Sequence, residues 1–160
     1  RLATEGKMAE PLPLNSSFLF NFDVELEPPL VLGSRRIVIA KGGRVEGTRV
    51  SGRILSGGGD WILARSDGIS LMDIRVAFET DDSAPVFMSC VGRRVVTADI
   101  AVQLTDREKR GALDPSRYYV RILPTFETAD ERYLWLNGIV GVGIGRYTST
   151  GVSFDVHEIL

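Results

Sequence analysis

Strict alternation of apolar and polar side chains constrains the fold of this chain more than any other feature. In residues 18–27, phenylalanine, valine and leucine occupy every second position, and Asn21, Asp23 and Glu25 lie between them. In residues 70–80, methionine, isoleucine, valine and phenylalanine share one face while charged residues share the other. A period of two residues is typical of a β-strand that buries one face. The chain is therefore predicted to consist mainly of β-strands.

Shorter runs of the same kind predict further strands, separated by turn residues. The expected strands, besides 18–26 and 70–80, cover residues 36–40, 50–55, 61–65, 85–91, 95–104, 118–123, 139–147 and 152–160. Gly42-Gly43 predicts a hairpin turn, and Gly92-Arg93 predicts a turn before the strand over 95–104. Two segments that begin at Thr105 and Thr128 have capping-box spacing and predict one or two helical turns each.

Eight or more short strands with little helix are typical of an antiparallel sandwich or barrel. The 17 glycines favour a barrel, because sharp bends at barrel corners require residues without a Cβ. At 160 residues the chain has the length of one domain. We predict a single closed or nearly closed antiparallel β-barrel over residues 18–160, after a flexible extension over residues 1–17. A seven-stranded sandwich is the alternative. Met8 is a candidate natural start, in which case residues 1–7 come from an added leader or an upstream start.

Charge and composition argue against several classes of protein. Nineteen basic and 21 acidic residues give a net charge of −2, which disfavours nucleic acid as a partner. No apolar run reaches the roughly 18–20 residues of a membrane helix, and the N-terminus lacks the apolar stretch of a secretory signal. We therefore expect a cytoplasmic protein that does not bind membranes. One cysteine and one histidine cannot supply several zinc ligands, so neither a metal nor a cofactor is expected.

The single cysteine and histidine also narrow the possible chemistry. Cys90 lies in an apolar run with no basic neighbour on its own face, so we expect it to be structural. His157 lies on the polar side of the last predicted strand, where we expect a surface position. The rival interpretation makes Cys90 a nucleophile and His157 its base. Without that pair, proton transfer depends on carboxylates and tyrosine.

Asp60 and Glu127 are the candidate catalytic carboxylates. Asp60 follows three glycines and precedes Trp61, whereas Glu127 precedes the second helical segment, which contains Trp135. Both carboxylates occupy predicted strand ends, which surround the mouth of a barrel. We expect them to face one cavity with the two indoles as apolar walls, since an apolar wall raises a carboxyl pKa toward neutrality. The alternative is a pair of capping carboxylates on opposite rims.

Other polar and aromatic residues are candidate ligand-binding groups. Asp73 and Arg75 project from one strand face, where the guanidinium could hold a carboxylate or enolate if that face lines the lumen. If the face is in solvent, they form an ordinary surface pair. Asn137 could donate to an oxyanion or end a helix. Tyr118 and Tyr119 point to opposite faces, so one of them is expected to face inward.

Seven short stretches in a particular order carry a family resemblance over about residues 18–160. They are Val45-Glu46-Gly47, Gly58-Gly59-Asp60-Trp61, Leu71-Met72-Asp73-Ile74-Arg75, Thr80-Asp81-Asp82, Tyr118-Tyr119 to Pro124, Phe126-Glu127-Thr128 and Trp135-Leu136-Asn137. The chain resembles the small barrel proteins called domain of unknown function 3237, and departs from their pattern at Ser83, Gly138 and Gly141. The resemblance implies a calycin-like barrel without an established reaction. It adds weight to a shared pocket formed by Asp60, Trp61, Asp73, Arg75, Asp82, Glu127, Trp135 and Asn137.

Two classes of function compete, and a third is weaker. The first is a cofactor-independent isomerase, cyclase or hydrolase that acts on a small aromatic or carbonyl-bearing compound through carboxylates at the barrel mouth. The second is a carrier or sensor of such a ligand, and the third is a structural barrel with a filled lumen. A homodimer is also expected, because the apolar face of residues 72–78 could form an exposed stripe.

Overall fold

The computed structural model describes residues 8–160 and shows ten strands and four short helices in that part of the chain. Residues 1–7, the proposed leader, lie outside the described residues. The strands are β1 (Ser16–Leu26), β2 (Leu30–Leu32), β3 (Arg35–Glu46), β4 (Gly52–Ile54), β5 (Gly59–Ala64), β6 (Ile69–Thr80), β7 (Pro85–Val95), β8 (Tyr119–Glu127), β9 (Gly141–Tyr147) and β10 (Gly151–Ile159). The helices are α1 (Ala98–Gln103), α2 (Arg107–Gly111), η1 (Pro115–Arg117) and η2 (Glu131–Gly138).

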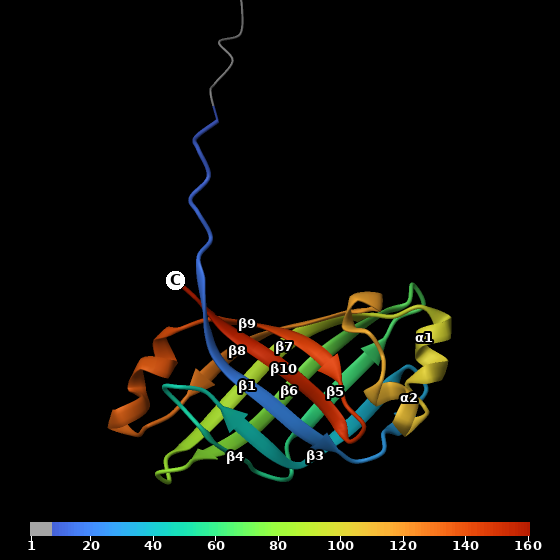
Figure 1. Ribbon diagram of the computed structural model, residues 1–160, viewed down its shortest axis with the longest axis horizontal. Coiled ribbons are helices and arrows are strands. Elements are labelled where there is room, and N and C mark those ends of the chain that lie inside the picture. The colour runs from blue at the N-terminus through green and yellow to red at the C-terminus, as the bar shows by residue number, and fades with distance from the viewer. Residues whose placement is uncertain (1–7) are drawn as a thin grey trace, which may run out of the picture.

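The strands close into an antiparallel barrel (Figure 1). Around the barrel, β1 pairs with β10, and β9, β8, β7 and β6 follow in order. The short strands β4 and β5 both bridge β6 to β3, and β3 pairs with β1 to complete the ring. The barrel thus has eight strand positions, and the predicted barrel is confirmed over the sandwich.

The alternating apolar residues line the interior, as the period of two predicts. Met72, Ile74, Val76 and Phe78 on β6 are all buried in the core. These four residues therefore form no stripe on the outside, and they give no argument for a homodimer, which stays a prediction. Burial of each such side chain contributes about 1.5–3 kcal/mol to folding, which is why they select the inner face.

Three local predictions differ from the structure, and two of them concern glycines that serve strand contacts rather than turns. Gly43 does not turn the chain but continues β3, where an added Cβ would lie 2.0 Å from the carbonyl oxygen of Asp23 on β1. Gly92 likewise continues β7, with an added Cβ 2.6 Å from the carbonyl oxygen of Arg121. The predicted strand over 95–104 is instead mostly α1, whose Ile100 packs into the core.

The strand predicted to end before Pro124 also continues, to the end of β8. On the β7 side Pro124 pairs with Cys90. On the other side the described pairing of β8 covers residues 121 and 122 and one isolated bridge from Thr125 to Val140, so Pro124 itself is not paired there. The missing proline N–H therefore costs little, since proline is tolerated where one side of a strand is free of ladder bonds.

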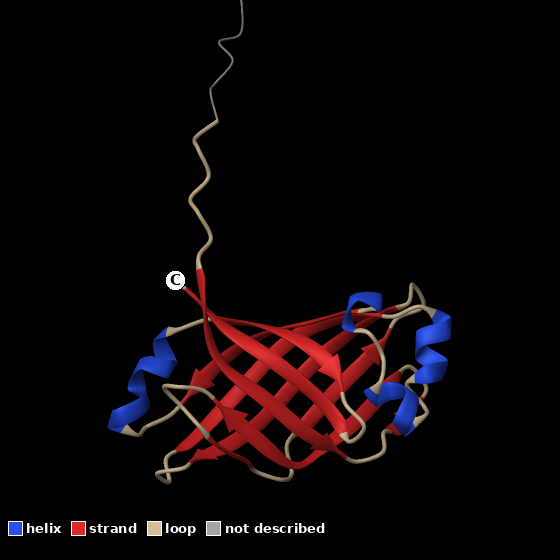
Figure 2. Ribbon diagram, in the orientation of Figure 1, coloured by secondary structure: helices blue, strands red, loops and turns tan. Residues whose placement is uncertain are grey.

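The two ends of the barrel differ. Helices α1, α2 and η1 lie at one end, and η2 covers the other (Figure 2). Near η2 the interior is filled by aromatic rings, with Phe20 lying 5.8 Å from Phe126 and 6.1 Å from Phe78 between ring centroids. Within residues 8–160, no helix is long and apolar enough to cross a membrane. The open space of the barrel lies toward α1 and α2.

Candidate functional site

A cavity of about 720 Å³ occupies the half of the barrel nearest α1 and α2. Its floor and walls are apolar and come from eight of the barrel strands; they include Phe22, Val24, Val38, Ile62, Met72, Ile74, Val76, Met88, Val120, Ile122 and Phe154. The volume falls in the range of small-molecule sites, which are largely apolar with few polar groups. A barrel whose interior is completely filled by side chains is therefore not supported by the structure.

Asp60 is the carboxylate on this apolar wall. It lies on β5 between Val38 of β3 and Ile74 of β6, and both of these neighbours also line the cavity. One carboxyl oxygen, Oδ1, accepts the backbone N–H of Asp73 at 3.0 Å. Burial raises the pKa of Asp60 from 3.8 to about 7, and the Asp73 N–H and the charge of Arg94 oppose that rise. At neutral pH, Asp60 is therefore present in both protonation states.

Arg94 brings a positive charge into the same cavity from β7. It follows Met88 and Cys90 on the inward face of the strand, in phase with their buried side chains. Its Nε is buried and has no hydrogen-bond partner among residues 8–160. Arg94 acts on Asp60 through its charge rather than through a hydrogen bond. A guanidinium is thus held in the cavity with a free donor.

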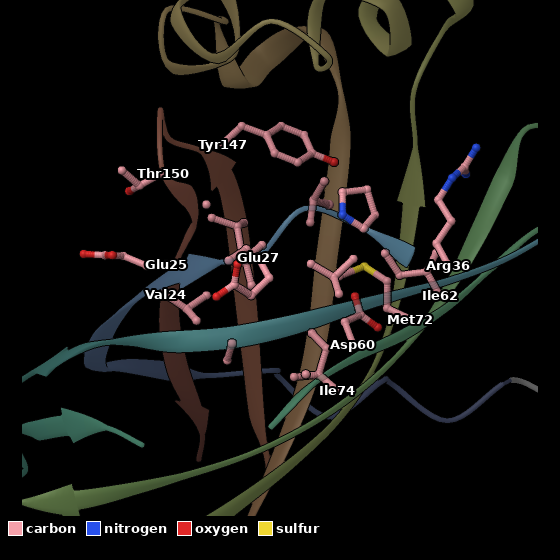
Figure 3. Close-up of a pocket in the computed structure, with 18 of the residues that line it drawn as sticks. Val24, Glu25, Glu27, Arg36, Asp60, Ile62, Met72, Ile74, Tyr147 and Thr150 are labelled. Carbon is pink, nitrogen blue, oxygen red and sulfur yellow. The ribbon is translucent and has the colours of Figure 1, made fainter. Parts of the chain in front are cut away.

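Tyr147 contributes a phenol at the end of β9. Its backbone N–H donates to the hydroxyl of Tyr118 at 3.0 Å, and the two rings lie 5.0 Å apart between centroids. Burial raises the Tyr147 pKa and the Arg94 charge opposes the rise, so the phenol stays protonated. Figure 3 shows Tyr147 and Asp60 on opposite sides of the cavity. Asp60, Arg94 and Tyr147 form the polar group of the cavity.

The mouth of the cavity is charged. Glu25, Glu27, Arg36 and Lys41 lie on the rim formed by β1 and β3. On the α2 side of the rim, Arg110 is fixed by its own bonds, since its Nε and Nη2 donate to the carbonyl oxygens of residues 148 and 149 at 2.9 and 2.7 Å. Across residues 8–160 no three His, Cys, Asp or Glu side chains gather in a way that suits a metal ion.

The structure corrects the predicted placement of Glu127. It lies on the outer face at the end of β8, next to η2, and pairs with Phe87 rather than facing Asp60's cavity. The reason is the alternation of β8, which turns Phe126 inward and therefore turns Glu127 outward. The two carboxylates do not share a cavity.

Three predicted binding residues near Asp60 lie outside the cavity. Trp61 follows Asp60 on β5 and so projects from the opposite face, and it is absent from the cavity lining. Asp73 and Arg75 form an exposed pair on the outside of β6, with 3.4 Å between Oδ1 and Nε. Asp73 and Arg75 are therefore the ordinary surface pair that the sequence offered as the alternative. Tyr119 is also outside, half exposed, with the Arg121 guanidinium 4.7 Å from its ring centroid.

The remaining predicted residues hold η2 on the closed end. Asn137 donates to the carbonyl of Thr128 at 2.9 Å and accepts the N–H of the same residue at 2.8 Å. The guanidinium of Arg49 lies over the ring of Trp135, 3.8 Å from the ring centroid, in a cation–π contact.

Asp82 lies at the same end of the barrel. It accepts hydrogen bonds from Thr80, Tyr133 and Arg132 at 2.6–2.9 Å. Asn137, Trp135 and Asp82 therefore serve the packing of η2 against the closed end, and they lie away from the cavity.

Sequence reasoning missed Arg94 and Tyr147. The signal for Arg94 was present, because a charged residue continues the inward phase of Met88 and Cys90 in a strand that does not turn at Gly92. Cys90 itself is buried, and burial raises its thiol pKa well above the ordinary value, so it is not an activated nucleophile. His157 packs its ring against Phe18 at 5.6 Å, away from the cavity.

Comparison with known proteins identifies the family. The model of the family described as "Protein of unknown function (DUF3237)" matches residues 14–159. A UPF0311 protein from Rhodopseudomonas palustris (strain ATCC BAA-98 / CGA009) is 36% identical over 139 residues, covering 86% of this chain and 88% of its own. The crystal structure of a conserved protein of unknown function from the same species matches with a TM-score of 0.85 and 30% identity, over 94% of this chain and all of that one.

Two further crystal structures share the fold. A β-barrel-like protein from Acinetobacter baumannii AYE has a TM-score of 0.79 and 33% identity, over 96% of this chain and all of that one. An enzyme from Penicillium herquei has a TM-score of 0.69 at 20% identity, over 96% and 100% of the two chains, which shows a common fold. On this agreement of sequence and structure, the chain belongs to the DUF3237 family of β-barrel proteins of unknown function.

Proposed function

We propose that the protein is a cofactor-independent enzyme that moves a proton on a small aromatic or carbonyl-bearing compound held in the barrel cavity. The observation that carries this proposal is Asp60, a carboxyl with a pKa of about 7 on the wall of an apolar cavity of about 720 Å³. A general acid–base group works best when its pKa lies near the working pH. Isomerisation, cyclisation and hydrolysis can each use such a group.

The surroundings of Asp60 support a catalytic rather than a structural role. Among residues 8–160, one of its oxygens is engaged, through the Asp73 N–H, which leaves Oδ2 free to face a ligand. Tyr147 has a protonated phenol on the opposite side and can donate a hydrogen bond to a carbonyl oxygen. An acid–base group opposite a neutral donor is an arrangement that favours enolisation.

The test begins with a thermal-stability screen of small phenols, keto acids and lactones against the purified protein, because a ligand of the folded state raises its melting temperature. Compounds that bind are then followed by NMR in D₂O with wild-type protein, Asp60→Asn and Glu127→Gln. We expect wild type and the outward-facing Glu127→Gln control to exchange or convert the ligand. Asp60→Asn should bind the ligand but lose about 100-fold or more in rate.

The carrier is the second candidate, and the apolar walls of the cavity favour it. A carrier would bind the same compounds without exchange or conversion by any of the three proteins. That result would refute the proposed catalysis and leave small-molecule binding in place. Failure of every compound of this class to bind would refute both.

A further inference from the structure

Arg94 has a charge that the described chain does not neutralise by contact. Its Nε is enclosed and makes no hydrogen bond within residues 8–160, although the guanidinium faces the cavity. An enclosed donor without a partner costs about 1–3 kcal/mol, so a ligand that supplies an acceptor at this position would gain that free energy. Arg94 and Asp60 line the same cavity, and the charge of Arg94 acts on the Asp60 carboxyl.

The other arginines near the cavity do not offer the same group. Arg110 and Arg107 of the α2 region donate their Nε to backbone carbonyls at 2.9 Å. Arg36 lies at the mouth, and Figure 3 shows its side chain directed away from Asp60. Arg94 is therefore the guanidinium available to a ligand that reaches Asp60.

The geometry points to Arg94 as the oxyanion-binding residue of the cavity, and hence to substrates that carry an enolisable carbonyl, an acidic phenol or a carboxylate. This inference rests on the proposed function and names its substrate class. A guanidinium binds planar oxyanions through well-directed N–H groups, and does so more strongly where water is excluded. The role that the sequence suggested for Arg75 thus belongs to Arg94.

The proton-transfer step balances without a co-reactant. The Asp60 carboxylate takes a proton from the carbon next to a substrate carbonyl, so that a C–H bond breaks and an O–H bond forms on Asp60. The C–H electron pair becomes a carbon–carbon double bond, and the carbonyl π pair moves to the oxygen, which the Arg94 N–H groups hold as an enolate. Asp60 then returns a proton to a carbon of the substrate, and in D₂O this is a deuteron where the Asp60 proton has exchanged with solvent.

A matched pair of ligands isolates the role of Arg94. The probes are 2-naphthoate and its neutral isostere 2-naphthamide, both of a size that such a cavity admits. Affinity is measured by calorimetry at about pH 6, where an ordinary carboxylic acid is ionised. Asp60 is mostly protonated at this pH, as it is when an enolate is bound. The variants are Arg94→Met, Arg94→Lys and the control Arg93→Met, whose residue lies on the exposed outer face of the same strand.

We expect wild type to bind naphthoate about ten-fold more tightly than naphthamide. Arg94→Met should lose about ten-fold or more for naphthoate and little for naphthamide, since a charge-assisted hydrogen bond is lost only with the anion. Arg94→Lys should retain part of the preference, and Arg93→Met should match wild type.

Two other outcomes have different meanings. If wild type binds both probes equally, or if Arg94→Met weakens both equally, the inference about Arg94 is overturned while small-molecule binding in the cavity stands. The wild-type comparison decides this even if no Arg94 variant folds. If neither probe binds wild type, both the inference and the proposed binding class are refuted.

Discussion

Replacement of Asp60 by asparagine should make the protein more stable at high pH, although it removes the residue proposed to be catalytic. The pKa of Asp60 is about 7 in the folded chain, compared with 3.8 for an unperturbed aspartate. Between these two values the folded state holds a proton that the unfolded state has released. Stability therefore falls as pH rises through this window, by up to about 1.4 kcal/mol per pH unit.

The size of the effect follows from the two pKa values. The full difference corresponds to about 4 kcal/mol, and solvent screening of the partly exposed carboxyl reduces this, so we expect about 2–4 kcal/mol. Below about pH 4 the carboxyl is protonated in both states and contributes nothing to the pH dependence. Asparagine resembles the protonated carboxyl in shape and can still accept the Asp73 N–H through its side-chain oxygen.

Urea unfolding of wild type and Asp60→Asn at a series of pH values measures this difference. We expect similar stabilities near about pH 4, a gap that widens up to about pH 7, and a constant gap above it, with the variant more stable. Asp130→Asn provides the opposite control: hydrogen bonds from Arg132 hold the pKa of Asp130 at about 2, so its contribution is present above the ordinary pKa and is lost as pH falls toward 2. Parallel stability curves for wild type and Asp60→Asn would refute the argument that burial controls Asp60.

Three further substitutions test the division between the cavity and the rest of the barrel. Asn137→Ala should cost about 1–3 kcal/mol in urea unfolding, because both hydrogen bonds to Thr128 are lost, while ligand affinity stays unchanged. Gly43→Ala should lower the melting temperature by several degrees or prevent folding, since its Cβ would lie 2.0 Å from the Asp23 carbonyl oxygen; an unaffected melting temperature would contradict that packing. Glu127→Gln should leave binding and turnover of any cavity ligand within a few-fold in the screening assays, and a loss of 100-fold would contradict its outward placement.

The candidate site was only partly accessible from the sequence. The sequence pointed to Asp60 because the residue follows a glycine bend at a predicted strand end and precedes an indole, although Trp61 projects away from the cavity. Glu127 was grouped with it because both lie at strand ends, but a barrel has two ends. The side-chain contacts of Asp82 and Asn137 reveal which end is closed by η2, and no local pattern carries that information.

The sequence by itself determined that the chain is built mainly of strands, because a period of two residues commits each strand to one buried and one exposed face. The sequence favoured a barrel, but it left a sandwich open until the closed ring of strands decided between them. It could not determine which strands contribute to one cavity, since residues such as Asp60 and Arg94 are far apart in the chain and come together only when the ring closes. Only the tertiary structure decided that one end is filled by phenylalanine rings and the other is hollow. Because Asp60 is buried among the apolar walls of this hollow end, its pKa rises to about 7.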